Sequence, residues 1–135
     1  MNLAVKKIQA DCMQYIVKHR EFSDFHGRFN VQTISEHGPS IRLGYLNWTI
    51  EDEVMHIDDL FINEAHRQYG IGSDLVETLL NLADLRGVHE VCGLADKNNA
   101  RLRKFYEQFG FHFDEAPNNH GQLPFRLYFV DADES

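Results

Sequence analysis

The chain has 135 residues, which is enough for one domain with a single hydrophobic core. Its 13 Lys and Arg residues against 21 Asp and Glu residues give a net charge of −8, the wrong sign for a nucleic-acid binder. The longest apolar run is Leu127 to Val130, whereas a membrane-spanning helix needs about twenty residues. We therefore expect a single domain over 1–135 that binds neither nucleic acid nor membrane.

The cysteines and histidines carry no signature of a metal site or of a disulfide framework. Cys12 and Cys92 have no Cys-x-x-Cys partner, and no two histidines have the spacing of metal ligands. The segment Met1 to Lys7 lacks the apolar stretch that a secretory signal needs. The expectation is a cytoplasmic protein with reduced thiols and no metal.

The first half of the chain is predicted to be mostly strands. A short strand is expected over Leu3–Ile8, whereas apolar side chains at helical spacing predict a helix over Ala10–Phe22. Alternating apolar and polar residues then predict strands over Phe29–Ile34, Ile41–Ile50 and Val54–Ile62. Short polar turns join these three strands, which indicates an antiparallel meander.

The second half alternates helices with strands. Ser73 is a suitable N-cap for a helix that continues to Arg86, and Gly87 is a suitable stop. Because Val88–Leu94 is reached through a helix, it should run parallel to the strand before that helix. The remaining elements are a helix from Asn99 to Gly110 and two strands, over 111–113 and 123–130. This order predicts an α+β fold with a mixed sheet.

The most informative segment is the loop from Arg67 to Ser73, which joins a strand to a helix. A helix N-terminus leaves about four N–H groups unpaired, and glycines let such a backbone approach a phosphate closely. No Lys precedes Ser73, so the segment is not a P-loop, and the third glycine of the dinucleotide-binding fingerprint is missing. Two interpretations remain. The loop is either a phosphate-binding loop of the pattern R-x-x-G-x-G, formed by Arg67, Gly70 and Gly72, or a connection whose glycines serve only tight packing.

This loop resembles motif A of the GCN5-related N-acetyltransferases. Asn99, followed by the segment from Phe105 to Phe111, resembles the second motif of that family, N-x6-Y and then Gly-Phe. The resemblance covers about 56 to 113. It implies a mixed, mostly antiparallel sheet with a splayed parallel pair at its centre and helices at its sides. Ala10–Phe22 leaves room for one helix where the family usually has two, in the region that normally walls the acceptor site.

The resemblance implies a binding site for acetyl-coenzyme A. Backbone groups of Phe61 and Ile62 would pair with pantetheine, and an N–H near Leu60 would polarise the thioester carbonyl. Loop amides would take the pyrophosphate, and Asn99 would bind the pantetheine or pyrophosphate region. The expected cofactor-binding residues are Leu60, Phe61, Ile62, Arg67, Gln68, Tyr69, Gly70, Ile71, Gly72, Ser73, Asn99 and Tyr106.

Three residues are candidates for catalysis. Tyr106 matches the usual general acid of the family, and a phenol with a pKa near 10 would be protonated at pH 7; the alternative is a core aromatic on an amphipathic helix. Asp58 and Asp59 are candidates to accept the proton of the ammonium. The resemblance to the polyamine N-acetyltransferases implies Asp58 as the base and Asp59 as a second acid that binds the amine. Adjacent strand residues point to opposite faces, so only one acid should face the acceptor unless a bulge intervenes. His56 is a weaker candidate base.

The adjacent acids resemble those of the diamine and polyamine (spermidine/spermine) N-acetyltransferases. The sequence thus favours a small primary amine as acceptor, a polyamine or diamine first, with direct attack in a ternary complex. Tyr45 and Trp48 are either substrate-stacking or core aromatics. Alternative acceptors are amino acids, aminoglycosides and protein or peptide amines, and a rival of another class is a non-catalytic acyl-CoA-binding module. The apolar segment 127–130 is a candidate homodimer contact.

Overall fold

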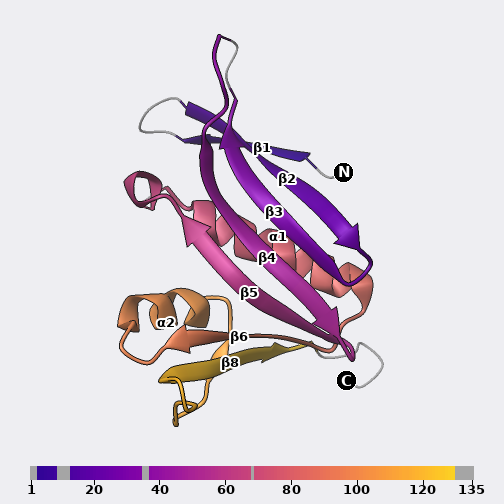
Figure 1. Ribbon diagram of the computed structural model, residues 1–135, viewed down its shortest axis with the longest axis vertical. Coiled ribbons are helices and arrows are strands. Elements are labelled where there is room, and N and C mark those ends of the chain that lie inside the picture. The colour runs from indigo at the N-terminus through magenta and orange to yellow at the C-terminus, as the bar shows by residue number, and fades with distance from the viewer. Residues whose placement is uncertain (1–2, 9–12, 35–36, 68, 130–135) are drawn as a thin grey trace.

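The computed structural model describes residues 3–8, 13–34, 37–67 and 69–129, which form one mixed sheet and three helical segments (Figure 1). The strands are β1 (Leu3–Ile8), β2 (Met13–Ser23), β3 (His26–Thr33), β4 (Arg42–Glu51), β5 (Val54–Ile62), β6 (Glu90–Asp96), β7 (His112–Phe113) and β8 (Gln122–Tyr128). The helices are η1 (Glu64–His66), α1 (Ile71–Arg86) and α2 (Ala100–Glu107). The strand order is β1-β2-β3-β4-β5-β6-β8-β7. Among these residues, no helix is long and apolar enough to cross a bilayer.

The first five strands form an antiparallel meander, so the prediction of a helix over Ala10–Phe22 is wrong from Met13 onward. Residues 10–12 lie outside the described residues. Within β2, buried Tyr15, Val17 and His19 alternate with side chains that are partly or fully exposed. This period of two is that of a strand with one buried face. The helical spacing that included Ile16 and Val17 was misleading, because adjacent strand residues point to opposite faces and only Val17 is buried. Every regular element described before β5 is a strand, so that part of the chain places no helix beside the expected acceptor site.

Helix α1 covers one face of the sheet and forms the core with it (Figure 1). Its buried side chains include Leu75 and Leu79, and the sheet contributes Leu46 and Trp48, all four of them 0% exposed. The helix begins earlier than predicted, because its N-cap is Gly70 rather than Ser73. Its end is confirmed: Gly87 adopts the left-handed conformation that a C-terminal glycine favours.

The sheet splays open between β5 and β6. The two strands run parallel, as predicted, but they pair only at Val54–Glu90, Met55–Val91 and His56–Cys92. Beyond this point β6 stays paired with β8, whereas β5 stays paired with β4. Helix α2 lies at the open end of the splay (Figure 1). The predicted α+β fold, with a splayed parallel pair inside a mostly antiparallel sheet, is confirmed.

Candidate active site

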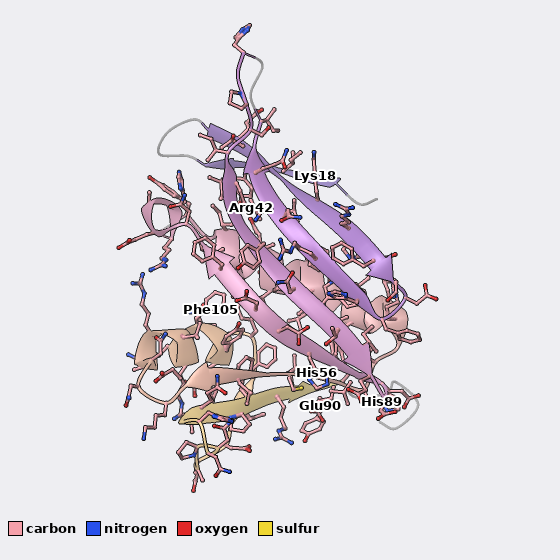
Figure 2. All side chains as sticks on the ribbon, in the orientation of Figure 1. Lys18, Arg42, His56, His89, Glu90 and Phe105 are labelled. Carbon is pink, nitrogen blue, oxygen red and sulfur yellow. The ribbon has the colours of Figure 1, made fainter. Side chains whose placement is uncertain are left out.

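A cavity of about 390 Å³ lies where the splayed end of β5, the start of α1 and the helix α2 meet. Its lining residues are Leu60, Phe61, Ile62, Arg67, Gly70, Gly72, Ser73, Asn99, Arg101, Leu102 and Phe105. Most of the residues expected to bind the cofactor are therefore brought together in one hollow. Figure 2 shows Phe105 between α2 and the splayed end of β5. One wall is apolar, and the other consists of loop backbone and cationic side chains.

The first turn of α1 gives this cavity backbone N–H groups of the kind that can hold an anion. Gly70 caps the helix with a φ of 77° and no side-chain cap bond, so the first N–H groups are left for another acceptor. A Cβ at Gly72 would lie 3.3 Å from Cζ of Phe105, so α1 and α2 approach closely here. Arg67 donates from Nε to the carbonyl oxygen of Ile62 at 3.1 Å, which ties the loop to the end of β5.

Four of the expected cofactor residues do not line the cavity. Gln68 lies outside the described residues. Tyr69 is half-buried and packs its ring 6.3 Å from that of His66. Ile71 turns its side chain into the core, which leaves only its backbone amide for a ligand. Tyr106 is buried, with its ring 5.2 Å from that of Phe105, which does line the cavity.

Sequence reasoning missed Arg101, Leu102 and Phe105 as lining residues. Asn99 accepts a hydrogen bond from the backbone N–H of Leu102 at 3.0 Å and so starts α2. Residues from the first two turns of α2, which follow this cap, line the cavity. The cap position and the spacing of Phe105 from it are the sequence signal that could have found these residues.

A β-bulge in β5 sets the geometry of the acid pair. Asn47 of β4 pairs with Asp59, but the next residue, Trp48, pairs with Ile57, so Asp58 is an extra residue. Such a bulge interrupts the alternation of side chains along a strand. Both Asp58 and Asp59 are exposed, on the face of the sheet away from α1. We expected only one of the two acids to face the acceptor unless a bulge intervened. The bulge is present, so both acids can lie on the same face.

Each carboxylate accepts a hydrogen bond from a hydroxyl of β4. Thr49 donates to Asp58 at 3.3 Å, and Tyr45 donates to Asp59 at 3.0 Å. The hydrogen bond to Asp59 raises the pKa of Tyr45, because loss of the phenolic proton would leave two negative charges together. Hydroxyl partners orient the carboxylates without neutralising them. A cationic amine can therefore still pair with either acid.

Of the two aromatic candidates on β4, only Tyr45 reaches this face. Trp48 is 0% exposed and donates from Nε1 to Nε2 of His19 at 3.3 Å, so it is a core residue. Burial, followed by the positive charge of Arg86, lowers the pKa of His19 and keeps it the neutral acceptor of that bond. Tyr45 lies with its ring 5.6 Å from that of Phe61, a cavity residue.

Tyr106 packs as a core aromatic but remains electrostatically linked to the acid pair. It is 3% exposed, its ring stacks on Phe125 with centroids 4.2 Å apart, and Phe111 meets it edge-on. Burial, and then the negative charge of Asp59, raise the pKa of Tyr106 well above its usual value. The phenol therefore holds its proton through the whole physiological range.

His56 and Cys92 face each other where β5 and β6 are still paired. The sulfur of Cys92 lies 3.2 Å from Nδ1 of His56. Figure 2 shows His56 near His89 and Glu90 at this end of the splay. Burial, and then the charge of Glu90, raise the pKa of Cys92 to about 11. The sequence could not reveal this contact, because it depends on the register of a parallel pair. Within the described ranges, no group of three or more His, Cys, Asp and Glu side chains could hold a metal ion.

Comparisons with known proteins agree on one fold. The model of the Acetyltransferase (GNAT) family matches residues 4–111. A D-amino-acid N-acetyltransferase of Saccharomyces cerevisiae is 32% identical over 76 residues, 53% of this chain and 47% of that protein. This chain thus spans about half the length of that curated relative.

Two solved structures are similar in backbone. The ribosomal-protein-S18-alanine N-acetyltransferase of Escherichia coli has a TM-score of 0.66 at 17% identity, over 82% of this chain and 73% of that one. The PaiA N-acetyltransferase of Thermoplasma acidophilum, solved with coenzyme A, has a TM-score of 0.63 at 13% identity, over 76% of this chain and 61% of that one. At these identities the likeness is one of fold.

Proposed function

This chain belongs to the Acetyltransferase (GNAT) family, and we propose that it transfers an acetyl group from acetyl-coenzyme A to the primary amine of a small molecule. The observation that carries the proposal is the cavity at the splay. It lies between the start of α1, which has no side-chain cap bond, and β5, the strand that carries the bulge and the two acids. Coenzyme A in the PaiA structure and the activity for which the yeast relative is named support the same chemistry.

The cavity residues fit the parts of acetyl-coenzyme A. The free amides of Gly72 and Ser73 and the cation of Arg67 suit a pyrophosphate. The apolar wall, which includes Phe61 and Phe105, suits the pantetheine chain. When bound there, the cosubstrate supplies an activated acetyl thioester, and an N–H near Leu60 is the donor we assign to its carbonyl oxygen.

The acid pair prepares the amine. An alkylammonium has no lone pair with which to attack a carbonyl carbon, so it must first lose a proton. We assign Asp58, directly or through water, to accept that proton and Asp59 to hold the amine. His56 stands beside Asp58 on the same face, with its Nδ1 already in contact with Cys92. The carboxylates are therefore the better candidates.

The reaction is balanced by two proton transfers. The amine nitrogen forms a bond to the acetyl carbon as the carbon–sulfur bond breaks, and the sulfur leaves as a thiolate. Tyr106 is the candidate to protonate that sulfur, and the second amine proton returns to the tyrosine or to water. Overall, an ammonium and a thioester become an amide, a thiol and one proton, with no covalent enzyme intermediate.

The class of amine is the open part of the proposal. A polyamine or diamine is the class that the adjacent acids favour, and the acceptor named for the yeast relative is a D-amino acid. Aminoglycosides and peptide amines are further candidates. The open face beside β5 supports an acceptor that approaches from solvent, opposite α1.

Two further expectations accompany the proposal. A homodimer through the late strands is supported by Tyr128 of β8, which is 57% exposed. Light scattering of the purified chain tests it, and a monomeric mass would contradict it. The free thiol of Cys92 fits the expected cytoplasmic location, which stays a prediction.

The substitution Tyr106→Phe tests the proposed reaction. We expect turnover, followed by thiol release from acetyl-coenzyme A, to fall by about 100-fold or more, the usual worth of a general acid. Affinity for coenzyme A should stay within about threefold, because Tyr106 does not line the cavity. Tyr128→Phe is the matched control, since it removes an exposed phenol from β8.

Three results would count against this assignment. Unchanged turnover in Tyr106→Phe would make this tyrosine a core aromatic only. An equal loss in Tyr128→Phe would show that the assay reports a general disturbance of the fold. Coenzyme A binding by the unaltered chain without turnover on any amine would favour a non-catalytic acyl-CoA-binding module.

A further inference from the structure

The face of the sheet opposite α1 is open over β2 to β5 and carries charges of both signs (Figure 1). Three residues form a row across it: Arg28 of β3 pairs with Asn47 of β4, which pairs with Asp59 of β5. Residues paired in this way point to the same face, with about 5 Å between neighbours. A cation and a carboxylate therefore stand two strands apart, with only an amide between them.

Tyr45 joins the two charges. Its ring lies under the guanidinium carbon of Arg28 at 4.5 Å and near that of Arg42 at 5.7 Å. Its hydroxyl donates to Asp59 at 3.0 Å. The guanidinium groups and the carboxylate thus contact one tyrosine side chain, and Phe61 links that side chain to the cofactor cavity. Figure 2 labels Arg42 on β4, above the splay.

Neither cation is neutralised within the part of the chain that the structure describes. Nε of Arg28 donates to Oδ1 of Asn47 at 2.6 Å, which holds the guanidinium in place and leaves its outer nitrogens for another acceptor. Arg42 is exposed, and its described contact is the ring of Tyr45. Guanidinium groups oriented in this way suit the two oxygens of a carboxylate.

A buried acceptor adjoins the same tyrosine. Asn30 pairs with Tyr45 across β3 and β4, and its Oδ1 is buried without a hydrogen-bond partner among the described residues. A buried polar atom of this kind is stabilised when a ligand brings a donor. Within the described chain, Asn30 therefore offers an unpaired acceptor beside Tyr45.

We propose that the acceptor is a primary amine that also carries a carboxylate, as an α-amino acid does, and that Arg28 and Arg42 bind this carboxylate while Asp58 and Asp59 receive the amine. The proposal rests on the proposed N-acetyltransferase function and names its substrate class. An α-amino acid carries its ammonium and its carboxylate on the same carbon, which suits a site whose opposite charges contact one tyrosine. A polyamine carries several positive charges and no negative one, so the two arginines would repel it.

The test compares three acceptors that share the leucine skeleton and differ at the carboxylate, with spermidine added as a polyamine. Racemic leucine, leucinamide, 3-methylbutylamine and spermidine are supplied to the full chain with acetyl-coenzyme A, and kcat and KM are measured by thiol release. We expect kcat/KM for leucine to exceed that for 3-methylbutylamine by roughly 10- to 100-fold, the worth of charge-assisted hydrogen bonds to one group. Leucinamide, which lacks the charge, should behave like 3-methylbutylamine.

Variants then assign the preference to residues. Arg28→Gln and Arg42→Gln should raise KM for leucine about tenfold or more and leave KM for 3-methylbutylamine within about threefold. Arg28→Lys keeps the charge but loses the planar fork, so its KM for leucine should lie between those of the unaltered chain and Arg28→Gln. Arg103→Gln, which removes an exposed cation of α2, controls for net charge.

The outcomes separate this inference from the function on which it rests. Equal kcat/KM for leucine and 3-methylbutylamine, a preference for spermidine, or equal changes of KM for both acceptors in Arg28→Gln would overturn the inference and leave the N-acetyltransferase function standing. Failure to acetylate any amine would remove both.

Discussion

Cys92 and His56 form a contact that, at the residue scale, invites a different mechanism. A thiol beside an imidazole is the arrangement of a cysteine nucleophile, which would take the acetyl group before the amine does. A reactive cysteine, however, has a lowered pKa, whereas burial and Glu90 raise the pKa of Cys92 to about 11. At pH 7 the thiolate fraction is then on the order of one in ten thousand.

The substitution Cys92→Ala tests whether this thiol takes part. We expect turnover to stay within about twofold, because a protonated thiol contributes no nucleophile. In the unaltered chain, alkylation of Cys92 by iodoacetamide should be slow at pH 7 and accelerate about tenfold per pH unit up to about pH 11. Cys92→Ala supplies the background that comes from Cys12. Rapid alkylation at pH 7, or loss of turnover in the variant, would instead indicate an acetyl-enzyme.

At the scale of elements, the two ends of α1 offer a matched pair of glycines. Gly70 and Gly87 have φ values of 77° and 69°, and no atom lies within 4 Å of a Cβ added to either. The cost of alanine at each position is therefore that of the left-handed backbone, about 1–2 kcal/mol. Only Gly70 lines the cavity.

Alanine at these two positions separates stability from binding. Gly70→Ala and Gly87→Ala should each lower the free energy of unfolding by about 1–2 kcal/mol in urea titrations. Calorimetric titration with coenzyme A should show weaker binding for Gly70→Ala, because a shift of the helix cap moves the amides of the first turn. Gly87→Ala should bind as the unaltered chain does. Equal affinities in the two variants would place the pyrophosphate away from this turn.

The elements also show what sequence patterns can predict. As expected, α1 ends at Gly87 and α2 begins at Asn99, because caps and stops are local features of the sequence. The strand β2 was predicted as a helix because the adjacent apolar residues Ile16 and Val17 fitted a helical spacing, although they lie on opposite faces of a strand. The bulge at Asp58 depends on the pairing of β5 with β4, and no pattern within β5 reveals it.

The same distinction holds for the candidate site. The R-x-x-G-x-G loop and Asn99 located the polar part of the cavity wall, because the start of a helix is built from one short segment. The cluster of Arg28 and Arg42 around Tyr45 was not predicted. It comes from three adjacent strands and exists only in their register.

At the scale of the whole molecule, the sheet has two unlike faces. Helix α1 and the core cover one face, whereas the other is open over β2 to β5 in the described part of the chain (Figure 1). The cofactor cavity and the charged face meet at Phe61. In the proposed function, an amine would reach the splay from one side while the cosubstrate occupies the other, which is the geometry that direct transfer requires.

Initial rates over a matrix of acetyl-coenzyme A and leucine concentrations test direct transfer most plainly. If the amine attacks while both substrates are bound, double-reciprocal lines at different leucine concentrations should intersect, in the unaltered chain and in Cys92→Ala alike. Parallel lines in the unaltered chain, together with loss of activity in Cys92→Ala, would show that the acetyl group is first transferred to Cys92. That result would contradict direct transfer.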